Sequence, residues 1–109
     1  MPLPEIPIGF RFEITFDFGR KLYSFPVIKT WETDQIEHFM LMASNKVLLF
    51  QSNRPMLRAK GLKNKRIDWK MIFGDTKNAS MIDEVINQIN YFIKCYEGHD
   101  PNYVHPKNS

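Results

Sequence analysis

Few side chains in this sequence are suited to nucleophilic or acid–base chemistry. Cys95 is the only cysteine, and it lies near the C-terminal end of a predicted helix, where the helix dipole disfavours a reactive thiolate. The sequence contains no Gly-x-Ser-x-Gly nucleophile elbow and no glycine-rich phosphate loop. We therefore expect a protein that is not an enzyme.

Metal chemistry has equally little support. The three histidines are His38, His99 and His105, and no two of them have the i, i+4 spacing of a helical zinc site. A single cysteine also rules out an intramolecular disulfide and a cysteine-based zinc knuckle. The sequence predicts surface or tail histidines, no metal site and no cofactor.

The segment from Arg54 to Lys70 is basic, with Asp68 as its only acidic residue. Clustered cations neutralise phosphates, and a neighbouring tryptophan can stack on a base. A nucleic acid or an anionic surface would then contact this loop through Arg58, Lys60, Lys63, Lys65, Arg66 and Trp69. The alternative is a solvated loop whose lysines keep a sheet edge from pairing with another chain. The lack of a nucleic-acid-binding fingerprint favours that alternative.

A predicted hairpin, with strands at Ile36–Ser44 and Lys46–Gln51, is apolar at both parities of its alternation. Such strands are usually covered on both faces, but the sequence predicts one helix for one face. The other face would then contact a protein partner or a second copy of the chain. The candidate contact residues are Met40, Met42, Leu48 and Phe50, and parity leaves open which of them face outward. The alternative is a sheet that curls and covers its second face with residues 1–8 or 103–104.

The elements that must position these residues begin with the clearest strand, Phe10–Phe18, in which apolar and polar residues alternate. A tight turn at residues 19–21 leads to a second strand, Leu22–Trp31. Pro26 predicts that this strand lies near an edge or at a bulge, because proline has no N–H to donate. Residues 52–66 are less regular, with a short strand expected at residues 56–60. The last predicted strand is Ile67–Phe73.

An amphipathic helix follows the last strand. Ser80 is its expected N-cap, because Asp83 follows three residues later as in a capping box. Asp83 and Glu84 are expected in the first turn, where the helix dipole favours acidic residues, and Gly98 is expected to end the helix. The predicted core stripe consists of Ile82, Val85, Ile86, Ile89, Phe92, Ile93 and Tyr96.

The chain has the size and composition of one folded domain. Its 109 residues are 43% hydrophobic and 14% aromatic, and its net charge is +3. We expect a proline-rich extended arm at residues 1–9, with a PxxP pattern at residues 4–7, a single domain at residues 10–98 and a tail at residues 99–109. No stretch is long and apolar enough to predict a membrane span, and no signal-peptide pattern is visible. A cytoplasmic location is therefore the default expectation.

These elements predict a two-layer α+β fold, a mainly antiparallel β-meander of about five to six strands packed against one C-terminal amphipathic helix. The alternative is a pleckstrin-homology-like barrel capped by the helix. The order of a strand bearing Trp69, a Gly74-Asp75 turn and an isoleucine-rich helix from Ile82 to Ile93 resembles a loose set of small bacterial proteins without an assigned function. That resemblance implies no activity.

We therefore expect a small non-enzymatic protein-binding or scaffold domain, able to form a homodimer. Binding of nucleic acid or an anionic surface through the basic loop 54–70 is the alternative.

Overall fold

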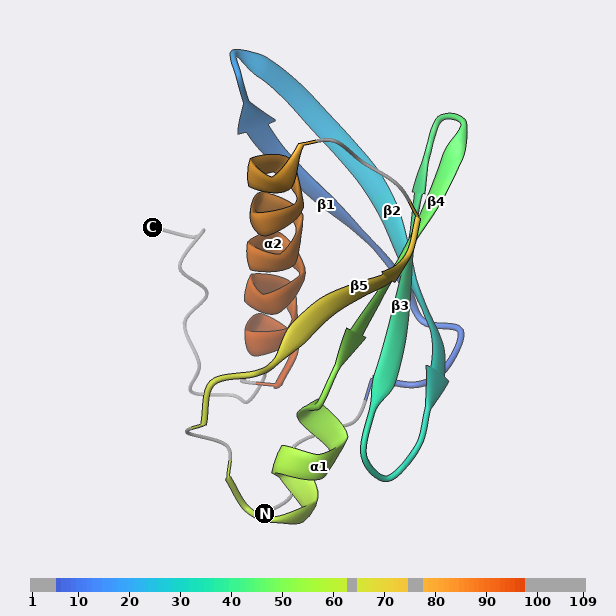
Figure 1. Cartoon of the computed structure of the whole chain (residues 1–109), viewed down its shortest axis with the longest axis vertical. Helices are drawn as coiled ribbons and strands as arrows, with labels where there is room; N and C mark the ends of the chain where they lie inside the picture. Colours follow the sequence, from blue (N-terminus) through green and yellow to red (C-terminus); the bar gives the residue numbers. More distant parts are fainter. Residues whose placement is uncertain (1–5, 63–64, 75–77, 98–109) are drawn as a thin grey trace.

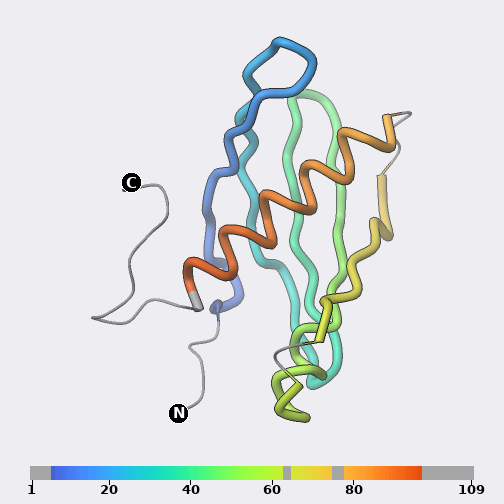
Figure 2. Tube along the Cα trace, turned by 90° about the vertical axis from the view of Figure 1, so that its left-hand side faces the viewer, coloured from blue at the N-terminus to red at the C-terminus, as the bar shows by residue number. Residues whose placement is uncertain are grey.

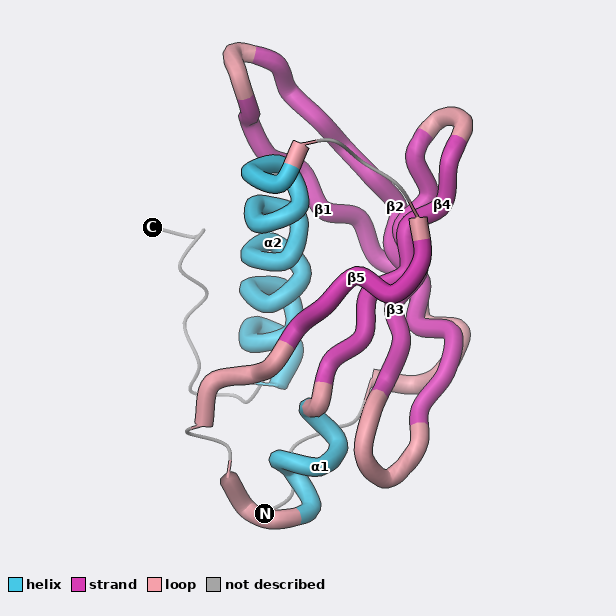
Figure 3. Tube along the Cα trace, in the orientation of Figure 1, coloured by secondary structure: helices cyan, strands magenta, loops and turns pink. Residues whose placement is uncertain are grey.

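The computed structural model describes residues 6–62, 65–74 and 78–97 of the chain. Its elements are, in order, β1 (Arg11–Phe18), β2 (Lys21–Glu32), β3 (Glu37–Ala43), β4 (Lys46–Ser52), α1 (Arg54–Ala59), β5 (Trp69–Phe73) and α2 (Ala79–Glu97) (Figure 1). The strands form one antiparallel sheet in the order β1-β2-β3-β4-β5 (Figure 3). The α+β fold of a meander with a C-terminal helix is confirmed. In the described residues β1 and β5 are the two edges, so the sheet is open and not a barrel.

Strand β1 follows the predicted alternation. Phe12, Ile14 and Phe16 are buried, while the residues between them are exposed. The turn to β2 has positive φ at Gly19 (58°) and Arg20 (69°), the left-handed pair that a two-residue hairpin with twisted strands requires. Local pattern alone therefore fixes the first hairpin.

Helix α2 runs diagonally across one face of the sheet (Figure 2). Phe92 stacks on Phe12 of β1 with ring centroids 3.9 Å apart, which ties the two layers together. The buried core between helix and sheet consists of Ile6, Phe12, Ile14, Phe16, Val27, Phe39, Leu41, Leu48, Phe50, Val85, Ile89 and Ile93.

The start of α2 differs from the prediction. Ala79 is the first helical residue, and the Oδ1 of Asn78 accepts a hydrogen bond from the Met81 N–H at 3.1 Å. Asn78 is therefore the cap in place of Ser80, because its side chain accepts from the N–H of the third helical residue, as an N-cap asparagine does. The first turn has no acidic residue, so Asp83 lies beyond it. The expected stop at Gly98 lies outside the described residues.

One further expectation is corrected. Residues 54–59 form helix α1 and not a strand at residues 56–60, because Pro55 lies in the first turn, where its fixed φ and missing N–H suit a helix. The expectation that Pro26 lies near an edge agrees with the sheet order, in which β2 is next to the edge strand β1. The pairing of β2 with β3 begins only at Val27, one residue after Pro26. Residue Ile6 of the predicted arm is buried in the core.

Candidate functional site

The face of the sheet turned away from α2 carries a row of apolar side chains. The registers place Ile28 opposite Met40, Met40 opposite Leu49 and Leu49 opposite Phe73, across β2, β3, β4 and β5. Arg11 on β1 continues the same row opposite Ile28. A second row contains Glu13 opposite Pro26 and Met42 opposite Val47. We call the set Ile28, Met40, Met42, Val47, Leu49 and Phe73 the outer apolar face.

No described element covers the outer apolar face, because both helices lie on the other side of the sheet (Figure 1, Figure 2). Val47 is 38% exposed and Phe73 is 63% exposed, and the remaining members are half-buried between their neighbours. Ile6 does not cover this face, since it joins the core on the opposite side. Residues 1–5 and 103–104, the other segments proposed to cover it, lie outside the described residues.

The hairpin candidates divide between the two faces. Met40 and Met42 lie on the outer apolar face, whereas Leu48 (6% exposed) and Phe50 (0%) are in the core. The outward-facing apolar residues of the hairpin are therefore Met40, Met42, Val47 and Leu49, because side chains alternate between the faces of a strand. Both parities are apolar here, so the sequence alone left their assignment open.

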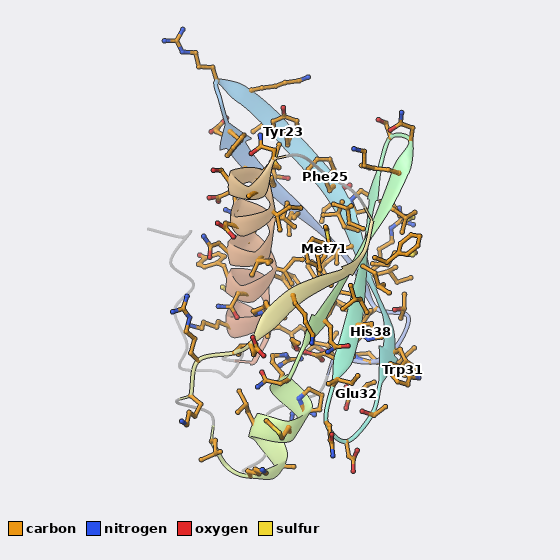
Figure 4. All side chains as sticks on the ribbon, in the orientation of Figure 1. Tyr23, Phe25, Trp31, Glu32, His38 and Met71 are labelled. Atoms are coloured by element: carbon orange, nitrogen blue, oxygen red, sulfur yellow. The ribbon has the colours of Figure 1, made fainter. Side chains whose placement is uncertain are left out.

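Trp31 and His38 form the lower end of the same side of the sheet (Figure 4). Their ring centroids are 4.8 Å apart, and the His38 Nε2 lies 3.1 Å from the Oε1 of Gln51. His38 is half-buried on β3, between Trp31 and Gln51. In the described residues no three His, Cys, Asp or Glu side chains gather as a metal site requires. His99 and His105 lie outside the described residues.

A buried cluster of charges lies on the core side, at the end of the sheet next to α1. Lys29 and Glu37 are 0% exposed and Arg54 is 4% exposed. The Lys29 Nζ lies 3.0 Å from the Glu37 Oε1, and the Arg54 Nη2 donates to the same oxygen at 3.0 Å. The Ser52 hydroxyl donates to the Glu37 Oε2 at 2.7 Å. Two cations and a hydroxyl thus surround one carboxylate.

A β-bulge extends this cluster outward. The β2–β3 register shifts between Lys29 and Trp31, so Glu32 points to the same side as Lys29 although the two are three residues apart. Lys29 also forms an ion pair with Glu32, whose Oε2 lies 3.5 Å from the Arg58 Nη1 of α1. The cluster therefore fastens α1 to the sheet.

The electrostatics of Glu37 favour a structural role. Burial alone would raise the pKa of its carboxyl, but the hydrogen bond and charge of Arg54, the Ser52 hydroxyl and the Lys29 charge together hold the pKa below its ordinary value. A fully surrounded carboxylate whose pKa is lowered is poorly suited to accept a proton from a substrate. Sequence reasoning missed this cluster, although Lys29 continues the core parity of Val27.

The basic segment does not form one cationic surface. Arg54 and Arg58 are engaged in the buried cluster, while Lys60, Lys65 and Arg66 are exposed. Lys63 lies outside the described residues. Two of the cations in this segment, Arg54 and Arg58, thus form ion pairs within the protein.

Trp69 faces the core side of β5, with its ring 5.9 Å from that of Phe39. Its indole Nε1 and the Oδ1 of Asn90 are buried without a hydrogen-bond partner in the described part of the chain. Both residues line a cavity of about 760 Å³ between β5 and α2. Stacking on a base would require Trp69 to leave Phe39.

A second cavity, of about 620 Å³, lies where the two hairpins separate. The β1–β2 pairing continues to Phe18 and Lys21, but the β2–β3 pairing ends at Val27 and Leu41. In Figure 1 the two hairpin ends point apart. The cavity is lined by Lys21–Phe25, Leu41–Lys46, Leu48, Met81, Ile82 and Val85. We call it the hairpin cleft.

Comparison with protein-family models, with curated proteins and with solved structures finds no match. The resemblance to small bacterial proteins therefore stays a prediction. Neither described helix has the length and apolar character needed to cross a membrane.

Proposed function

We propose that this chain is a non-enzymatic protein-binding domain that forms a homodimer through the outer apolar face. The observation that carries the proposal is the apolar row Ile28–Met40–Leu49–Phe73, which crosses four strands on the side away from both helices. Contiguous exposed apolar surface of this kind marks an interaction site. The two methionines in the set are well suited to such a contact, since their flexible side chains adapt to an opposing surface.

The pattern of this face fits a second copy of the chain. Arg11 and Glu13 lie on the same side of β1, in the two successive rows of the outer apolar face. A two-fold axis across the strands, between these rows, brings Arg11 of each copy opposite Glu13 of the other. The same axis lays Met40 over Met42 of the second copy and Leu49 over Val47. The surface is therefore complementary to itself, as a two-fold interface must be.

The geometry of such a dimer is that of two packed sheets. Sheets that pack face to face lie about 10 Å apart with nearly aligned strands, and their inner side chains interdigitate. The medium-sized side chains of the outer apolar face suit that spacing. Trp31, which is 45% exposed, would lie at the rim.

The first test is the mass of the protein in solution, measured by sedimentation equilibrium over micromolar concentrations. We expect twice the mass of the chain. Leu49→Glu should weaken the dimer at least about a hundredfold, because it buries a carboxylate without a partner in each half of the interface. Asn87→Glu adds the same charge on the exposed surface of α2 and should leave the mass unchanged. A monomeric wild type at about 100 μM, where even weak specific dimers form, would overturn the proposal.

A charge exchange tests the arrangement of the two copies. Arg11→Glu alone should weaken the dimer, because it sets two carboxylates against each other at two symmetric places. Combining Arg11→Glu with Glu13→Arg should restore the wild-type dissociation constant. If the combined variant stays as weak as the single one, the proposed two-fold axis is wrong.

A further inference from the structure

The hairpin cleft leaves one side of β2 without a neighbouring strand. Backbone groups of successive residues in an antiparallel strand point alternately to its two neighbours. The Lys29 N–H donates to the Phe10 oxygen at 3.0 Å, so odd-numbered residues of β2 point toward β1. The backbone groups of Leu22 and Ser24 then point into the cleft, where no described strand pairs with them.

Pro26 explains why the cleft exists. It belongs to the residues that face β3, and its next partner in the β2–β3 register would be Met42, two residues beyond the Ile28–Met40 pair. Proline has no N–H for that bond, and the ladder ends before it. From this point the β3–β4 hairpin separates from β2, while β2 remains paired with β1 to its turn.

The side chains of the cleft alternate in a way that suits an extended ligand. Tyr23 and Phe25 of β2 line one wall, and Leu41 and Leu48 line the other. Figure 4 shows Tyr23 and Phe25 in the space between the two hairpins. Met81 and Ile82 of α2 form the floor. The floor and walls are apolar, while the open side presents main-chain donors and acceptors.

The charged residues among the described lining are cations. Lys21 and Lys46 are the charged residues in the described part of the lining, one on each hairpin, and that part includes no aspartate or glutamate. Arg20, in the turn beside Lys21, is also exposed. A ligand with an acidic residue at this end would be favoured electrostatically.

We propose that the hairpin cleft binds an extended segment of another protein, which adds a strand to β2 between Lys21 and Pro26. The segment has roughly four residues in the cleft, given a strand rise of about 3.3 Å per residue. Alternate side chains are apolar and enter between the hairpins, and an acidic residue lies near Lys21. Main-chain hydrogen bonds to Leu22 and Ser24 supply the pairing. A second copy of the chain does not suit this site, because its strands arrive attached to a sheet.

The test uses random seven-residue peptides displayed on phage and selected on the immobilised full chain. We expect enrichment of sequences with alternating apolar residues and an acidic flank. The most strongly enriched peptide is then synthesised with a fluorescent label, and its dissociation constant is measured by fluorescence anisotropy. Failure to enrich any such pattern would overturn the proposal.

Two variants at one position separate main-chain pairing from side-chain contact. Ser24→Pro removes the N–H that faces the cleft without removing a bond to β1, and it should weaken the peptide about tenfold or more. Ser24→Ala keeps that N–H and should change affinity less than about twofold. Equal binding to Ser24→Pro and wild type would refute strand addition.

Amide hydrogen exchange on the wild type tests the proposal without any substitution, so the result does not depend on whether Ser24→Pro folds. Amide hydrogen exchange at Leu22 and Ser24 should slow when the selected peptide is added, while exchange at Tyr23 and Phe25 changes little. Unchanged exchange at Leu22 and Ser24 would refute the proposal. Leu49 does not line the cleft, so the Leu49→Glu variant should bind the peptide as the wild type does whether or not the dimer forms.

Discussion

Strand β2 is closed along Val27–Glu32 and open along Lys21–Pro26. In the closed half it pairs with both β1 and β3 until β1 ends, and its inward residues Val27 and Lys29 are fully buried. In the open half it pairs with β1 alone, and Tyr23 and Phe25 are only partly covered. One strand thus contains fully buried residues at one end and partly exposed residues at the other.

The closed half contains groups that stabilise the fold, whereas the open half contains the main chain for which we propose a binding role. The closed half accepts a buried lysine because Glu37 and Glu32 neutralise it, and the same carboxylates hold the arginines of α1. The open half has no such anchor, and its main chain is available. Pro26 lies at the boundary, so one residue without an N–H separates a packed interior from the strand segment that β3 does not pair with.

The largest effect should come from breaking the closed half. Glu37→Gln leaves Lys29 and Arg54 buried without their shared counter-charge, so we expect a loss of about 3–5 kcal/mol in the free energy of unfolding. Urea denaturation monitored by tryptophan fluorescence measures it. Asp34→Asn removes a carboxylate from the exposed β2–β3 connection and should cost less than about 0.5 kcal/mol. Equal losses in the free energy of unfolding of the two variants would show that Glu37 stabilises the protein no more than an exposed carboxylate does.

Lowering the pH should also reduce the free energy of unfolding, because it protonates Glu37 in the closed half. The pKa of Glu37 is lowered in the folded protein, so its contribution is complete above the unfolded value of about 4.3 and is lost as the pH falls through the folded value. The free energy of unfolding of the wild type should therefore fall more steeply below about pH 4.3 than that of Glu37→Gln. Parallel pH profiles for the two proteins would contradict the role assigned to Glu37.

The elements that could be predicted from the sequence are those whose structure depends on residues close together along the chain. The alternation of Phe12, Ile14 and Phe16 needs only a strand, and the stripe of Val85, Ile89 and Ile93 needs only a helix. The dihedral freedom of Gly19 was likewise visible in a short turn.

The parts that the sequence did not predict depend on contacts between distant residues. Lys29, Glu37 and Arg54 come from three elements, and the bulge after Lys29 reverses the parity by which Glu32 would be assigned. The arginines were read as a surface charge because their partner lies far away in the chain. Likewise, the two apolar parities of β3 and β4 become distinct only when α2 covers one of them.

Hydrogen exchange should resolve the open half residue by residue. In the free protein the amides of Leu22 and Ser24 should exchange much faster than those of Tyr23 and Phe25, which are bonded to β1. In the closed half the amides of Val27 and Ile28, one facing each neighbour, should both be slow. Slow exchange at Leu22 and Ser24 would mean that another part of the chain already occupies the cleft.

The smallest effect is expected where the two halves meet. Pro26→Val supplies an N–H that can bond to Met42 and extend the β2–β3 ladder, a gain of about 0.5–1.5 kcal/mol. It also gives the unfolded chain more freedom, a loss of about 0.4–1 kcal/mol. The free energy of unfolding should therefore change by less than about 1 kcal/mol, while the amide at position 26 becomes slow to exchange and the selected peptide binds more weakly. If that amide stays fast, Pro26 is not what keeps the ladder open. The side chains of Met81 and Ile82, which line the cleft, would then be what holds the two hairpins apart. In that case Met81→Ala should close the cleft.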